Sequence, residues 1–471
     1  MKKLLLLLCA GLSGAAFAAN GVSVSFHLNY PDAGTLAPVT VSAGNALPLA
    51  AKPHPEREGF RFGGWYTSAE CLPSEEWLFG TNSVGFYTQP TDSMAVEADM
   101  DLYAKWIAPT PVRTAEDLDA MRQDLKGWYV LENDIDLSGI ANWDPVGRYE
   151  AHYEFAPGEW WTQAFQGCLD GKGHTIRGLS LTQLLTDKSG LFGACANCEI
   201  RDVNMEGTRI VLTAERPYVG PLAGILKQDD GCQAVIRRCH VTGTRLEVKT
   251  TNSEGTFHSF TGLCGGAWGG LIEDCTATGS MDLDLCGAGG GKLYVGPFLG
   301  EAYNDTVGCE SDFDIRIRFS TPAANGLKAF IGGLQASATH VVSCTAKGRI
   351  EVSGNPGSPD IYIGGLVGSE RYGSVEDCGS AVEIVETGLP SVQVGGIIGE
   401  FNQSYGMIGA AFGTKATELL RCAFTGRIRL DGAGTEVFGE INGGGKPEPL
   451  SSPWGISMDY KITDCRYDPQ R

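Results

Sequence analysis

The stretch Val235-Ile-Arg-Arg-Cys-His-Val-Thr-Gly-Thr-Arg-Leu-Glu-Val248 decides the architecture of the chain, because its first half returns six more times. In each copy a β-branched residue or leucine stands three positions before a cysteine. The seven cysteines are Cys239, Cys275, Cys309, Cys344, Cys378, Cys422 and Cys465, at spacings of 36, 34, 35, 34, 44 and 43 residues. Periods of this size indicate stacked units that bury their apolar faces against their neighbours.

A second phrase, rich in glycine, lies between the cysteine copies, as in Ile363-Gly-Gly-Leu-Val-Gly368. Short alternations such as Arg349-Ile-Glu-Val352 fill the rest of each unit, and they favour strands over helices. We therefore predict an all-β fold in which coils of parallel strands form a solenoid over residues 127–471. Equivalent residues of successive coils then lie about 4.8 Å apart.

That spacing aligns the seven cysteines as a structural column inside the solenoid. Parallel side chains would hold the Cβ atoms wider apart than the roughly 3.5 to 4.5 Å that a disulfide prefers. We therefore favour a column of reduced, buried thiols, with disulfides between neighbouring rungs as the alternative.

The first 18 residues have the features of a secretory signal peptide. Two lysines precede an apolar run, and Ala16-Phe17-Ala18 forms the exit. The protein is therefore expected to be exported, and to be secreted or held at the cell envelope. Its net charge of -20 at pH 7 disfavours nucleic acid and anionic membrane surfaces as partners. No later stretch has the roughly 18 consecutive apolar residues that a membrane span needs.

Residues 22–106 form a separate unit of alternating strands broken by turn residues. The phrase Pro55-x-Arg57-x-Gly59-Phe60-x-Phe62-x-Gly64-Trp65-Tyr66-Thr67, followed by Asp101-Leu-Tyr-Ala-Lys-Trp106, resembles the Listeria-Bacteroides repeat, the B-repeat of internalin-type surface proteins. The resemblance implies a small β-grasp-like domain that serves as a spacer or an interaction module.

Two short elements join this unit to the solenoid. Residues 107–113 contain Pro109 and Pro111 and predict a semi-rigid linker. Residues 114–126 predict one amphipathic helix, because Thr114 is a good N-cap. Its apolar side chains at helical spacing are Leu118, Met121 and Leu125. We expect this helix to cap the open end of the solenoid.

A second resemblance covers residues 127–470. The phrase Phe165-Gln-Gly167-x-Leu169-Asp170-Gly171-Lys-Gly173-His174-Thr-Ile176, with Gly190-Leu-Phe-Gly193 behind it, looks like the opening of a GLUG-motif β-helix. Such repeats occur in bacterial surface proteins and beside the catalytic domain of some IgA-cleaving metallopeptidases. The resemblance implies a right-handed parallel β-helix. No pair of histidines stands four residues apart with a neighbouring glutamate, so the peptidase zinc site is not expected.

The sequence points to no cofactor, metal or catalytic residue. Acidic doublets such as Asp134/Asp136 and Asp282/Asp284 are interpreted as solvated positions. The better candidates lie in a loop that interrupts the repeat. Its binding residues are Tyr149, Tyr153, Trp160 and Trp161. Exposed aromatic side chains suit glycan rings or protein hot spots, although the same side chains could cover the solenoid end.

The sequence therefore predicts a monomeric, non-catalytic, adhesin-like interaction protein that binds a glycan or a surface protein. The alternative is a carbohydrate-active β-helix enzyme, either a polysaccharide lyase or a glycoside hydrolase, which would need two suitably placed carboxylates or a basic residue on one sheet.

Overall fold

The computed structural model divides into two units, residues 1–107 and 108–471. It describes residues 21–34, 36–48, 51–77, 79, 94–149, 163–214, 217–228, 232–250, 256–285, 291–320, 327–354, 360–389, 392–401, 418–431, 436–437, 461–463 and 465–467. The predicted signal peptide and the predicted site residues Tyr153, Trp160 and Trp161 lie outside these ranges. Within them, no helix combines the length and apolar character that crossing a bilayer requires.

The N-terminal unit is built on a four-stranded sheet in the order β2-β1-β6-β4. Its strands are β1 (Gly21–His27), β2 (Val39–Ser42), β4 (Arg61–Tyr66) and β6 (Met100–Ile107). Strands β1 and β6 pair in parallel, whereas β2 and β4 pair antiparallel to them. Two short strands, β3 (Asn45–Ala46) and β5 (Ala95–Val96), pair beside the sheet, and a 3-10 turn, η2, spans Pro73–Glu75. This mixed sheet confirms the predicted β-grasp-like domain.

Alternation along β1 explains why this sheet has one apolar face. Val22, Val24 and Phe26 are buried, and Phe26 packs edge-on against the buried ring of Trp65 at 4.7 Å. The spacing of the first family phrase also has a local reason, because the Arg57 guanidinium lies 3.8 Å from the ring centroid of Phe60. The second phrase contributes Trp106, whose ring centroid lies 5.9 Å from that of Phe62, so both phrases quoted for the resemblance serve packing within this domain.

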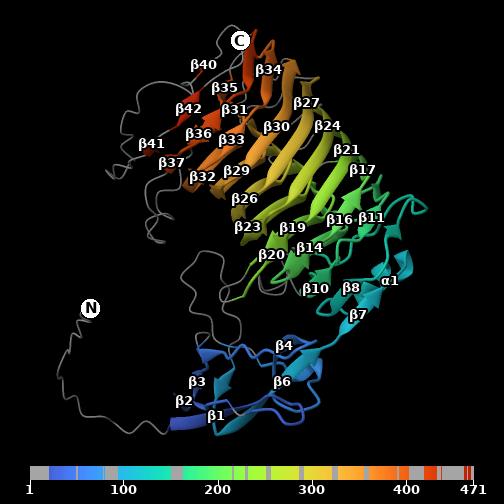
Figure 1. Cartoon of the computed structure of the whole chain (residues 1–471), viewed down its shortest axis with the longest axis vertical. Coiled ribbons are helices and arrows are strands. Elements are labelled where there is room, and N and C mark those ends of the chain that lie inside the picture. Colours follow the sequence, from blue (N-terminus) through green and yellow to red (C-terminus); the bar gives the residue numbers. More distant parts are fainter. Residues whose placement is uncertain are drawn as a thin grey trace, which may run out of the picture. The chain divides into compact units, whose positions relative to one another are not determined.

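The second unit is a solenoid of three parallel sheets, stacked coil upon coil (Figure 1). Sheet I contains β7 (Pro109–Val112), β8 (Trp128–Leu131), β10 (Cys168–Asp170), β14 (Phe192–Ala196), β15 (Glu199–Arg201), β19 (Ala223–Lys227), β20 (Val235–Arg237), β23 (Cys264–Glu273), β26 (Leu299–Val307), β29 (Gln335–Val342), β32 (Val367–Glu376), β36 (Ile398–Phe401), β37 (Glu418–Leu420) and β41 (Lys461–Thr463).

Sheet II contains β9 (Ile135–Asp136), β11 (Thr175–Arg177), β12 (Ser180–Leu181), β16 (Asn204–Glu206), β17 (Arg209–Ala214), β21 (His240–Thr250), β24 (Thr276–Leu285), β27 (Glu310–Phe319), β30 (Thr345–Gly354), β33 (Gly379–Ser380), β34 (Glu383–Thr387), β38 (Ala423–Phe424), β39 (Arg427–Leu430) and β42 (Arg466–Tyr467). Sheet III contains β13 (Lys188–Ser189), β18 (Tyr218–Val219), β22 (Thr256–Thr261), β25 (Gly291–Gly296), β28 (Leu327–Gly332), β31 (Asp360–Gly364), β35 (Gln393–Gly395) and β40 (Glu436–Val437).

Equivalent residues of successive sequence repeats pair with one another in these sheets. Ile236 pairs with Ile272 on the next coil, and Ile272 pairs with Thr306. These side chains are fully buried, so each coil closes the apolar face of the one before it. Because the unit is almost entirely β-structure with one short helix, the predicted parallel β-solenoid is confirmed.

On the coils from β15 to β37, the residue directly after the sheet I strand that leads into sheet II forms a corner between the two sheets. Asp202, Arg238 and Asp274 have φ angles of 55°, 48° and 52°, in the left-handed region. Arg238 donates two hydrogen bonds, of 2.7 and 2.8 Å, to the carboxylate of Asp202 on the preceding coil. These residues stand between strands, because one left-handed residue turns the chain from sheet I into sheet II.

The predicted capping helix is present but shorter than residues 114–126. Helix α1 spans Ala115–Ala120, and a 3-10 turn, η3, follows at Met121–Gln123. Thr114 is its N-cap, and the Thr114 hydroxyl accepts a 3.2 Å hydrogen bond from the Asp117 amide. Leu118 and Met121 are buried in the same apolar cluster as the first coil.

The predicted linker at 107–113 is largely wrong. Strand β6 runs to Ile107, and Pro109–Val112 forms β7, which pairs in parallel with β8. Strand β7 stands at the end of the order of sheet I. An edge strand tolerates proline because one side of it needs no ladder hydrogen bonds, so two prolines did not exclude a strand here.

A buried polar group interrupts the apolar core between β26 and β29. The Asn304 side-chain amide donates to Thr306 Oγ1 at 3.1 Å, and the Thr306 hydroxyl donates to Gln335 Oε1 at 3.1 Å. Among the described residues, Asn304 Oδ1 and Gln335 Nε2 have no hydrogen-bond partner. Gln335 pairs in register with Leu299, so an apolar side chain fits this position in the neighbouring coil.

We expect the double variant Thr306→Val/Gln335→Leu to be more stable than Gln335→Leu alone. The single change leaves the Thr306 hydroxyl buried without an acceptor, which costs about 1 to 3 kcal/mol. Replacing both partners by apolar groups removes that cost. Thermal unfolding of the wild type and both variants measures the difference, and equal midpoints for the two variants would contradict it.

Candidate functional site

Tyr149 is the one predicted binding residue among the described residues, and it contacts the outer side of the solenoid. Its ring meets the ring of Trp268 edge-on, with centroids 6.1 Å apart. Both rings pack on a small apolar floor outside the main core. The floor consists of Ala164, Ala194, Ala196 and Ile225. Tyr149 is half-buried, and burial raises the pKa of its hydroxyl to about 12.

Trp268 belongs to a column on the outer side of sheet I. It pairs in register with Lys227 on β19 and with Tyr303 on β26. Parallel partners in register point to the same side of a sheet. Tyr303 is 45 % exposed, one of the most exposed large apolar side chains of the described structure. Trp268 and Tyr303 therefore present two neighbouring rings on adjacent coils.

A lysine and a glutamate border these rings. Lys188 on β13 places its Nζ 4.2 Å from the ring centroid of Tyr218 and 5.8 Å from that of Tyr149. The Tyr218 hydroxyl donates a 2.7 Å hydrogen bond to Glu301 on β26. Burial lowers the pKa of Lys188, and the charges of Asp187 and Glu301 offset part of that shift. We call Tyr149, Lys188, Tyr218, Trp268, Glu301 and Tyr303 the aromatic patch.

The strands that carry the patch are irregular at this level. The register of sheet I shifts between Trp268 and Leu271, and again between Leu299 and Asp305 on the next pair. Gly269 and Gly270 follow Trp268 with φ angles of 87° and 96°. Bulges of this kind redirect side chains and are enriched beside functional sites.

The sequence analysis named Tyr149 as a candidate binding residue but did not name Trp268 or Tyr303. Trp268 is a single aromatic residue in the glycine-rich phrase Gly265-Gly-Ala-Trp268-Gly-Gly270, whereas the loop that contains Tyr149 has several aromatic residues close together. The loop was therefore the stronger sequence signal. The spacing within the repeat could have linked the two rings. Trp268 stands four positions after Cys264, and Tyr303 stands four positions after Leu299, the partner of Cys264 on the next coil.

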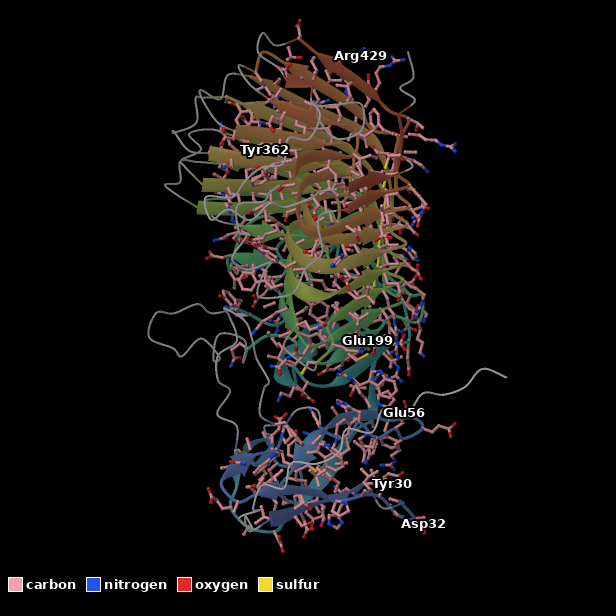
Figure 2. The ribbon with its side chains drawn as sticks, turned by 90° about the vertical axis from the view of Figure 1, so that its left-hand side faces the viewer. Tyr30, Asp32, Glu56, Glu199, Tyr362 and Arg429 are labelled. Carbon is pink, nitrogen blue, oxygen red and sulfur yellow. The ribbon has the colours of Figure 1, made fainter. Side chains whose placement is uncertain are left out.

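The seven repeat cysteines lie at the same position of successive coils, and Figure 2 shows a line of yellow sulfur atoms that runs along the stack. They are free thiols, buried except for the half-buried Cys465. The Cys309 amide donates to Cys344 Sγ at 3.3 Å, and the Cys344 amide donates to Cys378 Sγ at 3.4 Å. Burial raises the pKa of the Cys239 and Cys309 thiols.

Within the described ranges, no group of histidine, cysteine and acidic side chains is arranged to hold a metal ion. The structural role of the column stays a prediction.

Three carboxylates of the solenoid, those of Asp134, Asp170 and Asp282, are held in ion pairs. Asp134 accepts a 2.8 Å hydrogen bond from Arg177, and Asp282 accepts one of 3.1 Å from Arg318. Buried Asp170 accepts a 2.8 Å hydrogen bond from Arg201. Although burial raises the pKa of Asp170, the hydrogen bonds from Arg201 and Lys172 outweigh that effect and leave it lowered. A carboxylate held in the charged form is poorly suited to act as a general acid.

Asp170→Asn is expected to destabilise the solenoid at neutral pH by about 2 kcal/mol, because hydrogen bonds to charged groups contribute about 1.5 to 3 kcal/mol. The pKa of Asp170 is lower in the folded chain than in the unfolded one. Its stabilising effect is therefore present above the unfolded pKa and is lost as the pH falls through the folded pKa. Thermal unfolding at pH 7 and pH 3 tests this, since an equal gap between the two proteins at both values would contradict it.

Comparisons with known proteins cover the two units unequally. Residues 23–105 match the family model of the Listeria-Bacteroides repeat domain, which is typical of extracellular or surface proteins. No curated protein matches the chain. The chain is similar to a crystal structure from Bacteroides ovatus named "putative immunoglobulin A1 protease", at 15% sequence identity and a TM-score of 0.40. That similarity covers 77% of this chain and 84% of the other. With so low a TM-score, the fold of the solenoid rests on its own strand pairing, and the GLUG resemblance stays a prediction.

Proposed function

We propose that this chain is an exported, non-catalytic interaction protein that binds a surface ligand through the aromatic patch. The single observation that carries the proposal is the pairing of half-buried Trp268 with exposed Tyr303 on adjacent coils. Binding energy concentrates on aromatic anchors, and two neighbouring rings on the outer side of a sheet provide such anchors.

Two further features support the proposal. The Listeria-Bacteroides repeat domain at residues 23–105 favours a location outside the cytoplasm. The solenoid supplies a rigid scaffold, and rigid scaffolds commonly carry binding groups at the places where the regular repeat is broken. The patch lies where sheet I is bulged.

We expect the double variant Trp268→Ala/Tyr303→Ala to lose binding to whichever ligand the wild type captures. Arrays of immobilised glycans and extracellular proteins, probed with the intact protein, provide the measurement. Tyr103→Ala is a matched control, because Tyr103 is a half-buried tyrosine on β6 of the other unit. Equal binding by the double variant would move the site away from the patch.

Export is tested separately on the cells that produce the protein. The mature chain should begin near Ala19 and should be found in the medium or accessible on intact cells. An unprocessed chain that stays in the cytoplasm would overturn this part of the proposal.

A further inference from the structure

The aromatic patch has the dimensions of an extended chain ligand. Trp268 and Tyr303 occupy the same register on β23 and β26, and adjacent strands lie about 4.8 Å apart. That step is comparable with the length of one hexose unit in an extended polysaccharide. A glycan lying along the stack would therefore place successive sugars over successive coils.

The chemistry of the patch suits a ligand that is apolar on its faces and polar at its edges. The two rings offer apolar surface, and the floor beneath Tyr149 and Trp268 is made of alanine and isoleucine. At the margins, Lys188 and Glu301 provide an ammonium group and a carboxylate. Pyranose rings have this division, because their C–H faces stack on aromatic rings and their hydroxyl groups form hydrogen bonds at the edge.

The charges of the patch favour an uncharged glycan. Lys188 lies over the ring of Tyr218, and Tyr218 is hydrogen-bonded to Glu301, so these two opposite charges belong to one linked cluster, and Lys227 adds one cation in register with Trp268. The chain as a whole carries a net charge of -20 at pH 7. A field of that sign repels polyanions such as uronate-rich or sulfated polysaccharides.

A folded protein partner fits the patch less well. A stable protein interface buries about 800 Å² on each side and surrounds its anchors with an apolar core. Here Lys227 pairs with Trp268 from the preceding coil, and two bulged glycines follow Trp268 along its own strand. The rings therefore form a narrow strip along the stack instead of a broad apolar face.

We infer that the aromatic patch binds a neutral polysaccharide that runs along the solenoid across Trp268 and Tyr303. This inference rests on the proposed interaction function and names its ligand class. Two consequences follow from the strip geometry. Affinity should rise with the length of the oligosaccharide, and both rings should contribute to it.

Calorimetric titration of the intact protein tests the inference. The probes are neutral hexose oligosaccharides of two and six units, prepared from α-glucan, β-glucan, mannan and galactan, with polygalacturonate and heparin as anionic probes. We expect one neutral hexamer to bind at least tenfold more tightly than its dimer. Trp268→Ala and Tyr303→Ala should each weaken that binding at least tenfold, whereas Trp268→Phe and Tyr103→Ala should bind within about twofold of the wild type.

The outcomes separate the ligand class from the broader function. Unfolding midpoints of all variants show whether a loss of binding reflects a loss of structure, and the Trp268→Phe variant keeps a ring at the site. Binding only to anionic probes or to proteins, with loss in Trp268→Ala, overturns the inference and leaves the interaction function standing. Neutral-glycan binding that is unchanged in both alanine variants overturns the assigned site. Capture of no glycan or protein by the wild type overturns the inference and the proposed function together.

Discussion

Gly365→Ala is expected to prevent the solenoid from forming its native corner between sheets III and I. A Cβ atom at Gly365 would lie 2.1 Å from the carbonyl oxygen of Gly396 on the next coil. The Gly365 amide donates a 3.0 Å hydrogen bond to the Gly395 carbonyl, so the two coils cannot separate without losing their pairing. Because the obstacle is backbone, no rotamer change relieves it. We expect a loss of at least about 4 kcal/mol, which is exceptional for one substitution.

Gly379→Ala is the matched control for this change. Gly379 lies on β33 a short distance along the same chain, and the nearest atom to an added Cβ is Thr345 Cγ2 at 3.8 Å. That variant should fold like the wild type. Soluble yield, circular dichroism and the unfolding midpoint of the three proteins provide the comparison. A Gly365→Ala protein with the midpoint of the Gly379→Ala protein would contradict the corner packing.

Cys344→Ala is expected to lower the free energy of unfolding by about 2 kcal/mol, from the cavity and from a buried amide left unpaired. Cys344 is fully buried, and its sulfur accepts the hydrogen bond of the Cys309 amide at 3.3 Å. Its thiol in turn donates to the Val342 carbonyl at 3.2 Å. Alanine removes all of these contacts at once. Denaturant-induced unfolding of the purified variant measures the effect.

Cys232→Ala serves as the control, because Cys232 is half-exposed and stands outside the column. It should change stability by no more than about 0.5 kcal/mol, the range of ordinary surface substitutions. The column thiols from Cys239 to Cys422 should also resist a thiol reagent at pH 8 until denaturant is added, because they are buried and the reagent cannot reach them in the folded chain. Rapid labelling of the native column, or a mass that shows disulfides, would contradict the packing role.

Much of the fold could be predicted because the same residues recur at the same register. A β-branched residue or leucine three positions before each repeat cysteine marks an inward position, and in the structure Ile236 and Ile272 do pair across neighbouring coils. The corner residues and the linker could not be read in the same way. A left-handed residue such as Arg238 leaves no sequence signature when it is not glycine, and Pro109 is compatible with a spacer as well as with an edge strand.

The candidate site was harder to predict, because its residues come from five segments that are distant in the sequence. Tyr149 was found as part of an aromatic loop, but its partners Trp268 and Lys188 are far from it in sequence. A bulge directly after Trp268 breaks the alternation of two by which a strand face is usually recognised. Only the observed pairing of Trp268 with Tyr303 shows that both rings share one side of sheet I.

We propose that the aromatic patch binds a ligand, and we propose no catalytic role for any part of the solenoid. The most direct test measures binding and breakdown of a polysaccharide in the same sample. The intact protein is incubated with a neutral polysaccharide that it binds, and the recovered polysaccharide is analysed by mass spectrometry for chain length and for unsaturated ends. We predict that the polysaccharide is recovered intact and that Trp268→Ala no longer retains it. Shortened or unsaturated chains that accumulate with time in the presence of the wild type would contradict the account and support a carbohydrate-active enzyme instead.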